Sequence, residues 1–276
     1  MRRLTLLGAL CLLPLLAAQA EERNDIPGCY PYAQLSDQQP APSGRELVVI
    51  IDETVQMSPE LQRSAWDHAM RYVQPGDRVR LYQFSAFLQN NYMKLQFAGT
   101  LDSPLQGKVR NSIGSNSLKQ LDACLKQQAV FFQKNFGKQF VASFGKPGAD
   151  IARSEVFGSL KKIGEDIALR PAQEKVVLLV SDMLENSDFG SFYSSNHIRD
   201  IDPETELKKV EQKNLFSDLG GARVYVHGAG LVSGDKGAYR SGSTLQKLEQ
   251  FWNAYLQRSN ASLASFGTPE LTVDLR

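Results

Sequence analysis

The residues best suited to chemistry follow an apolar run in the segment ELVVIIDETVQMSPE, residues 46–60. Asp52 and Thr54 come directly after that run, and Gln56 lies two positions further on. A carboxylate, a hydroxyl and an amide carbonyl are oxygen ligands of the kind that Mg²⁺ prefers. The same residues could also perform acid–base chemistry or simply end a strand, so the rest of the chain has to separate these interpretations.

A second acidic residue occupies the same kind of position. The segment KVVLLVSD, residues 175–182, is another unbroken apolar run, and it ends at Asp182. Apolar runs without polar alternation are typical of strands that are covered on both faces. The carboxyl ends of parallel strands meet at one edge of a sheet, and ligands bind at that edge. We therefore expect Asp52 and Asp182 to lie together there.

Helical and strand patterns alternate along the rest of the chain. Apolar residues recur at helical spacing in the segments 61–72, 118–136, 156–167 and 245–256, and a charged helix is expected at 204–217. Further strands are expected at RVRLYQF, NYMKLQFAG, ARVYVHGAG and ASLASFG. This alternation predicts an α/β fold with a doubly wound, mostly parallel sheet and helices on both faces. We expect one domain over residues 45–276, with an insertion around 100–150.

The N-terminus has the features of an export signal. Residues 1–20 combine two arginines, an apolar stretch and small residues before an acidic EER, which predicts a secretory signal peptide cleaved after Ala20. The apolar stretch is short for a membrane span, and no later segment approaches the roughly 20 residues that a span needs. We therefore expect a periplasmic or secreted protein, in which residues 21–44 form an extended leader without periodicity.

Two cysteines outlast the signal peptide, namely Cys29 and Cys124. An even pair in an oxidising compartment favours a disulfide. The alternative is a free Cys29 with Cys124 buried on an apolar helix face, because sequence gives no distance between two sulfurs.

Charge gives little support to binding of nucleic acid or a membrane surface. The whole chain has 31 basic and 30 acidic residues, and loss of Arg2 and Arg3 with the signal leaves a net charge of −1. Polyanion-binding proteins usually have a clear basic excess, so we expect no nucleic-acid partner.

Several segments together resemble von Willebrand factor A domains. LVVIIDETVQM resembles the first strand with its metal motif, VQPGDRVRLYQFS the following helix-to-strand passage, and KVVLLVSDM the fourth strand. ARVYVHGAG and FWNAYLQRSNASLASFG resemble the late strand, last helix and last short strand. The resemblance covers about residues 45–270.

Members of that family hold a divalent cation with an Asp-x-Ser-x-Ser motif, a Thr from a second loop and an Asp after the fourth strand. The resemblance places Asp52 at the first Asp, Thr54 at the first Ser, Ser154 at the Thr and Asp182 at the late Asp. Gln56 departs from the motif, because a neutral carbonyl on a longer arm replaces the second hydroxyl. Two interpretations stay open: an Mg²⁺ or Mn²⁺ site, or strand-end carboxylates that bond to nearby backbone.

The segment 183–203 is expected to be a long loop at the same edge. It mixes aromatic and acidic residues, and long loops without structure of their own are often binding loops. We expect Glu185, Phe189, Phe192 and Tyr193 to contact a partner, although the aromatic rings could instead fold back onto the core.

Three functions are compatible with these observations. The first is an exported, non-enzymatic domain that binds a partner protein at the carboxyl edge of its sheet. The second is a metal-dependent phosphoester hydrolase with Asp52 and Asp182 as ligands, although Thr54 stands where phosphoryl-transfer enzymes of the haloacid dehalogenase type have a second Asp. The third is a metal-free structural subunit of an envelope complex.

Overall fold

A computed structural model of the chain describes residues 23–88, 91–144, 153–194, 197–232 and 242–276. The predicted signal peptide, residues 1–20, lies outside the described residues. Among the helices that are described, none is both long and apolar enough to cross a membrane.

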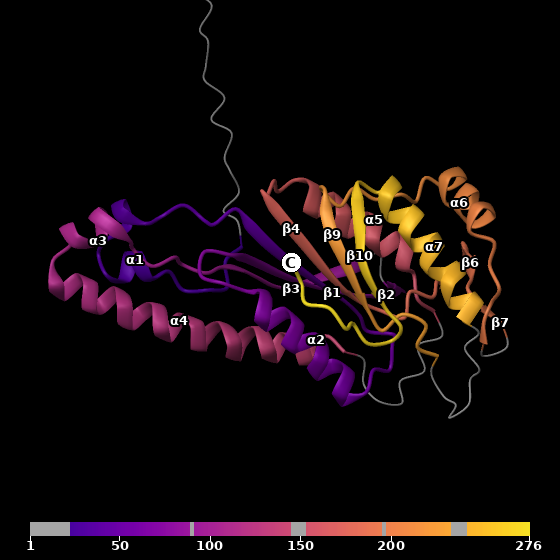
Figure 1. Cartoon of the computed structure of the whole chain (residues 1–276), viewed down its shortest axis with the longest axis horizontal. Coiled ribbons are helices and arrows are strands. Elements are labelled where there is room, and N and C mark those ends of the chain that lie inside the picture. The colour runs from indigo at the N-terminus through magenta and orange to yellow at the C-terminus, as the bar shows by residue number, and fades with distance from the viewer. Residues whose placement is uncertain (1–22, 89–90, 145–152, 195–196, 233–241) are drawn as a thin grey trace, which may run out of the picture.

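A six-stranded sheet forms the centre of the molecule (Figure 1). Its spatial order is β10-β9-β4-β1-β2-β3, and every neighbouring pair is parallel except β2 and β3. The strand bounds are β1 Arg45–Asp52, β2 Arg78–Leu88, β3 Asn91–Thr100, β4 Glu174–Val180, β9 Ala222–His227 and β10 Ala261–Gly267. The predicted fold class, α/β with a mostly parallel sheet, is confirmed.

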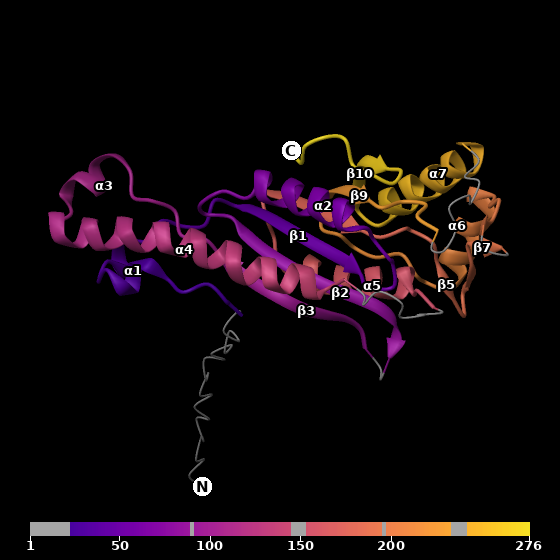
Figure 2. The ribbon, with the colours of Figure 1, turned by 90° about the horizontal axis from the view of Figure 1, so that it is seen from below.

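Helices cover both faces of this sheet (Figures 1 and 2). One face packs against α2 (Pro59–Tyr72) and the C-terminal half of α4 (Ser115–Ala142). The opposite face packs against α5 (Val156–Ala168), α6 (Pro203–Gln212) and α7 (Gly242–Arg258). Two hydrophobic cores therefore lie back to back across the sheet.

The central strand β1 supplies both cores by simple alternation. Val48 and Ile50 contribute to the α5 side, whereas Leu47, Val49 and Ile51 contribute to the α2 side. All five side chains are fully buried. Successive side chains of a strand point to opposite faces, so an unbroken apolar run is the pattern required of a strand with helices above and below it.

An arm projects beyond the sheet and consists of α1 (Cys29–Tyr32), the 3-10 helix η1 (Ser36–Gln38), α3 (Gly107–Ser112) and the N-terminal half of α4 (Figures 1 and 2). It has a small core of its own around Tyr30, Leu105 and Leu121. The predicted disulfide is confirmed: Cys29 bonds to Cys124 and joins α1 to α4. The expected insertion around 100–150 thus forms α3 and α4, which complete the arm and cover one face of the sheet.

The predictions for two segments were wrong. Residues 21–44 were expected to be extended, yet they contain α1 and η1. Residues 183–203 were expected to lack structure, yet they form two short hairpins, β5 (Asn186–Ser187) with β6 (Gly190–Ser191) and β7 (Tyr193–Ser194) with β8 (His197–Ile198). Elements of two to four residues are too short to show a hydrophobic period, and tertiary contacts hold them instead.

Replacing both cysteines by serine should lower the free energy of unfolding by about 2–5 kcal/mol, because the bond closes a loop of 95 residues. Denaturant unfolding with and without reductant measures the effect. The serine variant should be insensitive to reductant. Equal unfolding midpoints for the oxidised wild type and the variant would contradict the prediction.

Candidate functional site

The candidate site lies at the carboxyl end of β1, where the order in which the chain adds strands to the sheet reverses. From β1 the chain passes to β2 on one side, and later returns to β4 on the other side of β1. Ile51 of β1 pairs with Val180 of β4, so the residues that follow these two strands leave the sheet side by side. In open α/β sheets this reversal opens a crevice at the carboxyl ends of the strands, which is where ligands bind.

Asp52 is the centre of the site. One oxygen of its carboxylate accepts hydrogen bonds from the backbone N–H and the hydroxyl of Thr54, at 3.0 and 2.6 Å. The other oxygen accepts from the hydroxyls of Ser154 and Ser181, at 3.1 and 2.9 Å. The side chain is 1% exposed. Asp52 therefore connects the segments that follow β1 and β4 with the one that precedes α5.

Asp182 lies beside this cluster and is also buried. Its carboxylate accepts a hydrogen bond from the backbone N–H of Leu184 at 2.9 Å and another from the hydroxyl of Tyr193. The carbonyl of Asp182 accepts from Gly230 after β9, at 2.8 Å. We call Asp52, Asp182 and the hydroxyl residues bonded to them (Thr54, Ser154, Ser181 and Tyr193) the acidic-pair site.

Burial raises the pKa of both carboxyl groups. Burial raises the pKa of Asp182 to about 8, and the nearby negative charge of Asp52 adds to the shift. Burial also raises the pKa of Asp52, although the hydrogen bonds from Thr54, Ser181 and Ser154 oppose it. Two buried carboxylates so placed need a proton or a cation between them, since like charges in a low dielectric are costly.

The structure brings together the four residues predicted as metal ligands. Thr54 and Ser154 each donate a hydrogen bond to Asp52. Asp182 lies close enough for the negative charge of Asp52 to raise its pKa. Gln56 is exposed, because Val55 and Met57 on either side of it point into the core. The departure from the motif at Gln56 is therefore matched by a side chain that faces solvent.

Sequence reasoning missed Ser181 and did not predict the contact between Tyr193 and Asp182. Ser181 is fully buried and directly precedes Asp182, so its position immediately after the buried strand β4 was an available signal. Tyr193 was expected to contact a partner, but its hydroxyl bonds to Asp182 from the hairpin β7–β8. Local sequence carries no signal for a tyrosine that folds back over eleven residues.

The predicted contact role of Glu185 is wrong, because this carboxylate is only 1% exposed. It accepts a hydrogen bond from the backbone N–H of Phe157 at 3.0 Å and another from the hydroxyl of Ser187. Burial raises the pKa of Glu185 to about 7, while these bonds oppose the shift. Glu185 thus satisfies a free N–H group in the first turn of α5, where a negative charge is also favoured by the helix dipole.

The predicted contact role of Phe192 is wrong for a similar reason. Its ring is buried, with its centroid 6.1 Å from Phe157 and 5.3 Å from Phe251 of α7. Phe189 is partly buried and lies 4.8 Å from the same Phe157 ring. Edge-to-face aromatic packing of this kind fixes the 185–193 segment onto α5 and α7.

The oxygen groups of the acidic-pair site are chemically suited to a divalent cation. Mg²⁺ takes about six oxygen ligands and keeps several of them as water. A hydroxyl that donates its hydrogen to Asp52 still has lone pairs on its oxygen, so Thr54, Ser154 and Ser181 could bond to Asp52 and ligate an ion together. Within the described ranges, no cluster of three or more His, Cys, Asp or Glu residues is arranged to hold a metal, so the hydroxyls would be essential.

Comparisons with known proteins leave the family open. No family model matches the chain, and no curated protein does. Three solved structures are similar over part of the fold. The type V pili tip protein Mfa5 from Porphyromonas gingivalis, represented by three N-terminal domains, is 16% identical with a TM-score of 0.29, over 52% of this chain and 20% of that one.

The ArnB paralog VWA2 from Sulfolobus acidocaldarius is 14% identical with a TM-score of 0.33, over 68% of this chain and 36% of that one. An aerotolerance-related membrane protein from Bacteroides fragilis is 11% identical with a TM-score of 0.33, over 82% of this chain and 90% of that one. At such identities and TM-scores the likeness identifies neither the family nor the function of this chain.

Stability should fall as the pH rises from about 7 to about 8 in metal-free buffer. Asp182 titrates near 3.8 when unfolded and near 8 when folded, so in this window only the folded state keeps the proton, and the free energy of unfolding drops with pH. The raised pKa of Glu185 acts in the same direction only up to about 7. The lowered pKa of His227 matters only below its usual 6.5.

Melting temperatures across that window test the effect. The Asp182→Asn variant, which cannot ionise, should show a flatter dependence on pH than the wild type. Asp188→Asn is the matched control, because the Asp188 side chain is 94% exposed and should leave the slope unchanged. A wild-type slope in Asp182→Asn would be evidence against the assignment.

Proposed function

We propose that the chain is an exported, non-enzymatic binding domain of the von Willebrand factor A type, which takes a partner protein at the carboxyl edge of its sheet. The observation behind this proposal is the buried pair of Asp52 and Asp182, held by hydroxyls from separate segments at the point where the strand order reverses. Burying two carboxylates next to each other costs free energy. A contact that depends on a bound cation would give this burial a function. The sequence resemblance and the sheet order support the same choice.

In this proposal Asp52 orients the hydroxyls of Thr54, Ser154 and Ser181, and Asp182 supplies the second negative charge. Bound Mg²⁺ or Mn²⁺ would let both carboxylates ionise and would offer an open position to an acidic side chain of the partner. Metal binding would displace the proton that Asp182 otherwise keeps, so affinity should rise with pH.

The partner would contact exposed residues at this edge rather than Glu185 and Phe192, which are buried. Gln56 and Asp188 are exposed near the acidic-pair site, and Arg153, which pairs with Asp188, directly precedes Ser154. Charged and amide side chains of this kind are typical of the polar rim of a protein interface.

A binding role is favoured over hydrolysis by the surroundings of Asp52. A general base or nucleophile needs a free lone pair that a substrate can reach. Asp52 is buried and accepts four hydrogen bonds, two on each oxygen. That arrangement suits a carboxylate that orients other groups.

Export is supported by the bond between Cys29 and Cys124. Disulfides persist in oxidising compartments such as the periplasm and the extracellular space. The proposed signal peptide, residues 1–20, provides the route to either location.

Adding Mg²⁺ or Mn²⁺ at millimolar concentration should raise the melting temperature and give a heat of binding by titration calorimetry. At ten times the dissociation constant the gain in unfolding free energy is about 1.4 kcal/mol. Asp52→Asn should abolish the response and Asp188→Asn should keep it. An unresponsive wild type, or an equal response in Asp52→Asn, would contradict the metal site.

A photoreactive residue at Gln56 or at Asp188 should crosslink a partner in the envelope of the producing cell. The same residue at Leu169 is the control, since Leu169 is 79% exposed but follows α5 at the opposite, amino edge of β4. Mass spectrometry should identify one protein shared by the two edge positions and absent from the control. Identical products at all three positions would exclude a specific binding edge.

A further inference from the structure

We propose that the groove between α2 and α4 is a second binding site, distinct from the carboxyl edge, and that it receives an acidic amphipathic helix of a partner protein. The groove contains two hollows with volumes of about 340 and 370 Å³. Both lie between the same two helices, and both are lined mainly by apolar side chains. This inference does not depend on the proposed function.

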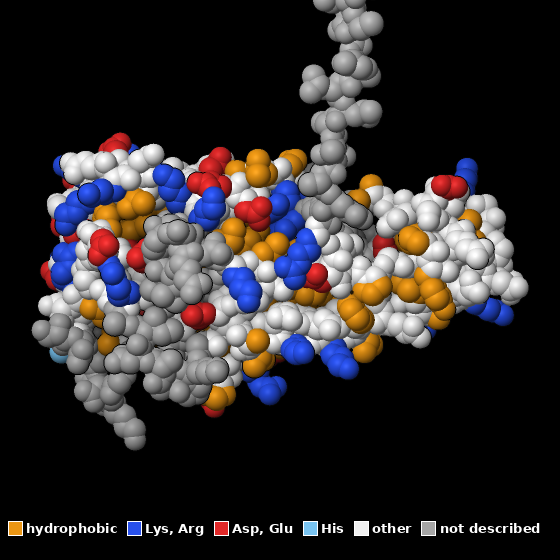
Figure 3. Space-filling model, turned by 180° about the vertical axis from the view of Figure 1, so that it is seen from behind, with side chains coloured by type: hydrophobic (Ala, Val, Ile, Leu, Met, Phe, Trp, Pro, Cys, Tyr) orange, Lys and Arg blue, Asp and Glu red, His pale blue; other side chains and the backbone are white. Residues whose placement is uncertain are grey.

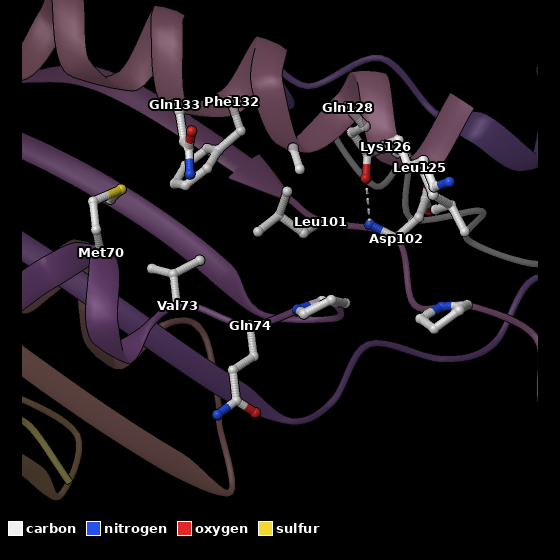
Figure 4. A pocket seen from close by; sticks show the side chains of 13 residues that line it. Met70, Val73, Gln74, Leu101, Asp102, Leu125, Lys126, Gln128, Phe132 and Gln133 are labelled. Atoms are coloured by element: carbon white, nitrogen blue, oxygen red, sulfur yellow. Dashed lines mark hydrogen bonds between the residues drawn. The ribbon is translucent and has the colours of Figure 1, made fainter. Parts of the chain in front are cut away.

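The first hollow lies between the C-terminal end of α2 and the middle of α4 (Figure 4). Phe132 and Leu125 of α4 face Val73, Met70 and Leu101 across it. The one carboxylate at its wall, that of Asp102, is committed elsewhere. It accepts hydrogen bonds from the backbone N–H of Cys29 and the side chains of Gln39 and Gln128, at 2.7 to 2.8 Å.

The second hollow lies further along the same groove, where Pro59 and Trp66 of α2 face Gly137, Phe140 and Val141 of α4. Gly137 allows Trp66 to pack closely on α4, since a Cβ at this position would lie 3.1 Å from the Trp66 ring. Between the hollows, Trp66 stacks on Phe136 with ring centroids 5.8 Å apart. The groove therefore offers two separate pockets rather than one continuous channel, which suits two anchoring side chains better than a single acyl chain.

On α4 the first hollow is lined by residues between 125 and 133, and the second by residues between 137 and 141. Ala129 lines the first and Phe140 lines the second, eleven positions further along α4. Eleven residues correspond to about 16 Å, or three helical turns. A helix lying along the groove would thus present side chains i and i+11 from one face, one to each hollow.

The charge around the groove selects an acidic partner. Lys126 lines the first hollow and Arg63 the second. The acidic residue of α4, Asp122, is paired with Arg110 at 2.7 Å, so its charge is already compensated. Opposite charge on the partner would increase the association rate and disfavour basic competitors.

An exposed apolar residue also forms part of the second hollow. Val141 of α4 lines this hollow and is 66% exposed. Figure 3 shows hydrophobic side chains and lysine or arginine side chains interspersed along the lower edge of the molecule, where α4 runs. Helix-in-groove recognition needs an apolar floor with charged rims, and this surface supplies both.

The test uses a fluorescein-labelled helical peptide of 18 residues, rich in alanine and glutamate, with leucines at two positions eleven apart. Fluorescence anisotropy with the full-length mature protein measures binding. Two control peptides have the leucines nine apart, on opposite faces of the helix, or lysines in place of the glutamates. We expect the first peptide to bind at least about tenfold more tightly than either control.

Variants of the protein locate the binding. Ala129→Trp fills the first hollow and Lys126→Glu reverses the charge beside it, so each should weaken binding about tenfold. Ala123→Trp is the matched control, since Ala123 is exposed on α4 but lines neither hollow. Equal binding of the three peptides, or equal effects of Ala129→Trp and Ala123→Trp, would overturn the proposal.

Phosphatidylglycerol vesicles form the third arm of the experiment. Cosedimentation that depends on Lys126 without any discrimination among the peptides would show that the surface binds an anionic membrane, and would equally overturn the proposal. Peptide discrimination without vesicle binding is the expected result.

Discussion

The hydrogen bonds to the carboxylate of Asp52 are the constraint on which the carboxyl edge depends. They join the turn after β1, the approach to α5 and the end of β4 through Thr54, Ser154 and Ser181. Three chain segments far apart in sequence are thereby fixed to one buried charge. Asp182 then has to lie next to that charge, and Tyr193 closes over it. The hairpins of the 186–198 segment follow from this arrangement, since their position satisfies Asp182 on one side and buries Phe192 on the other.

The same arrangement explains why acidic and aromatic side chains of the 185–193 segment point inward. Glu185 turns inward to the first turn of α5, and the aromatic rings of the segment pack on Phe157. Buried charges of this kind are stable only when their partners are complete, because an unpaired buried carboxylate is far more costly than an exposed one. The acidic-pair site is therefore best described as a preorganised cluster whose net charge a proton on Asp182 can adjust.

The parts of the fold and of the site that could be predicted from the sequence are those set by local patterns. The strands around Val49 and Leu178 were evident because fully buried parallel strands have unbroken apolar runs, and the positions of Asp52 and Asp182 followed from where those runs end. The family resemblance supplied Thr54 and Ser154. Tertiary contacts decided the rest: the inward turn of Glu185 requires the first turn of α5, and burial of Phe192 requires α7. The helices α1 and η1 are three or four residues long, and the bond between Cys29 and Cys124 and the contacts of Tyr30 stabilise α1 instead of any local period.

The long helix α4 belongs to both the arm and the sheet. Leu121 lies in the core of the arm, whereas Phe132, Phe136 and Phe140 lie in the core beneath the sheet. Its 28 residues span about 42 Å as one rigid element, and a helix is much stiffer along its axis than a loop of equal length. A mechanical force on the arm would therefore be transmitted through α4 to the sheet. It would act as shear between the sheet and the phenylalanine rings of α4. The molecule would transmit a pull on its projecting end to its core instead of absorbing it in a flexible connection.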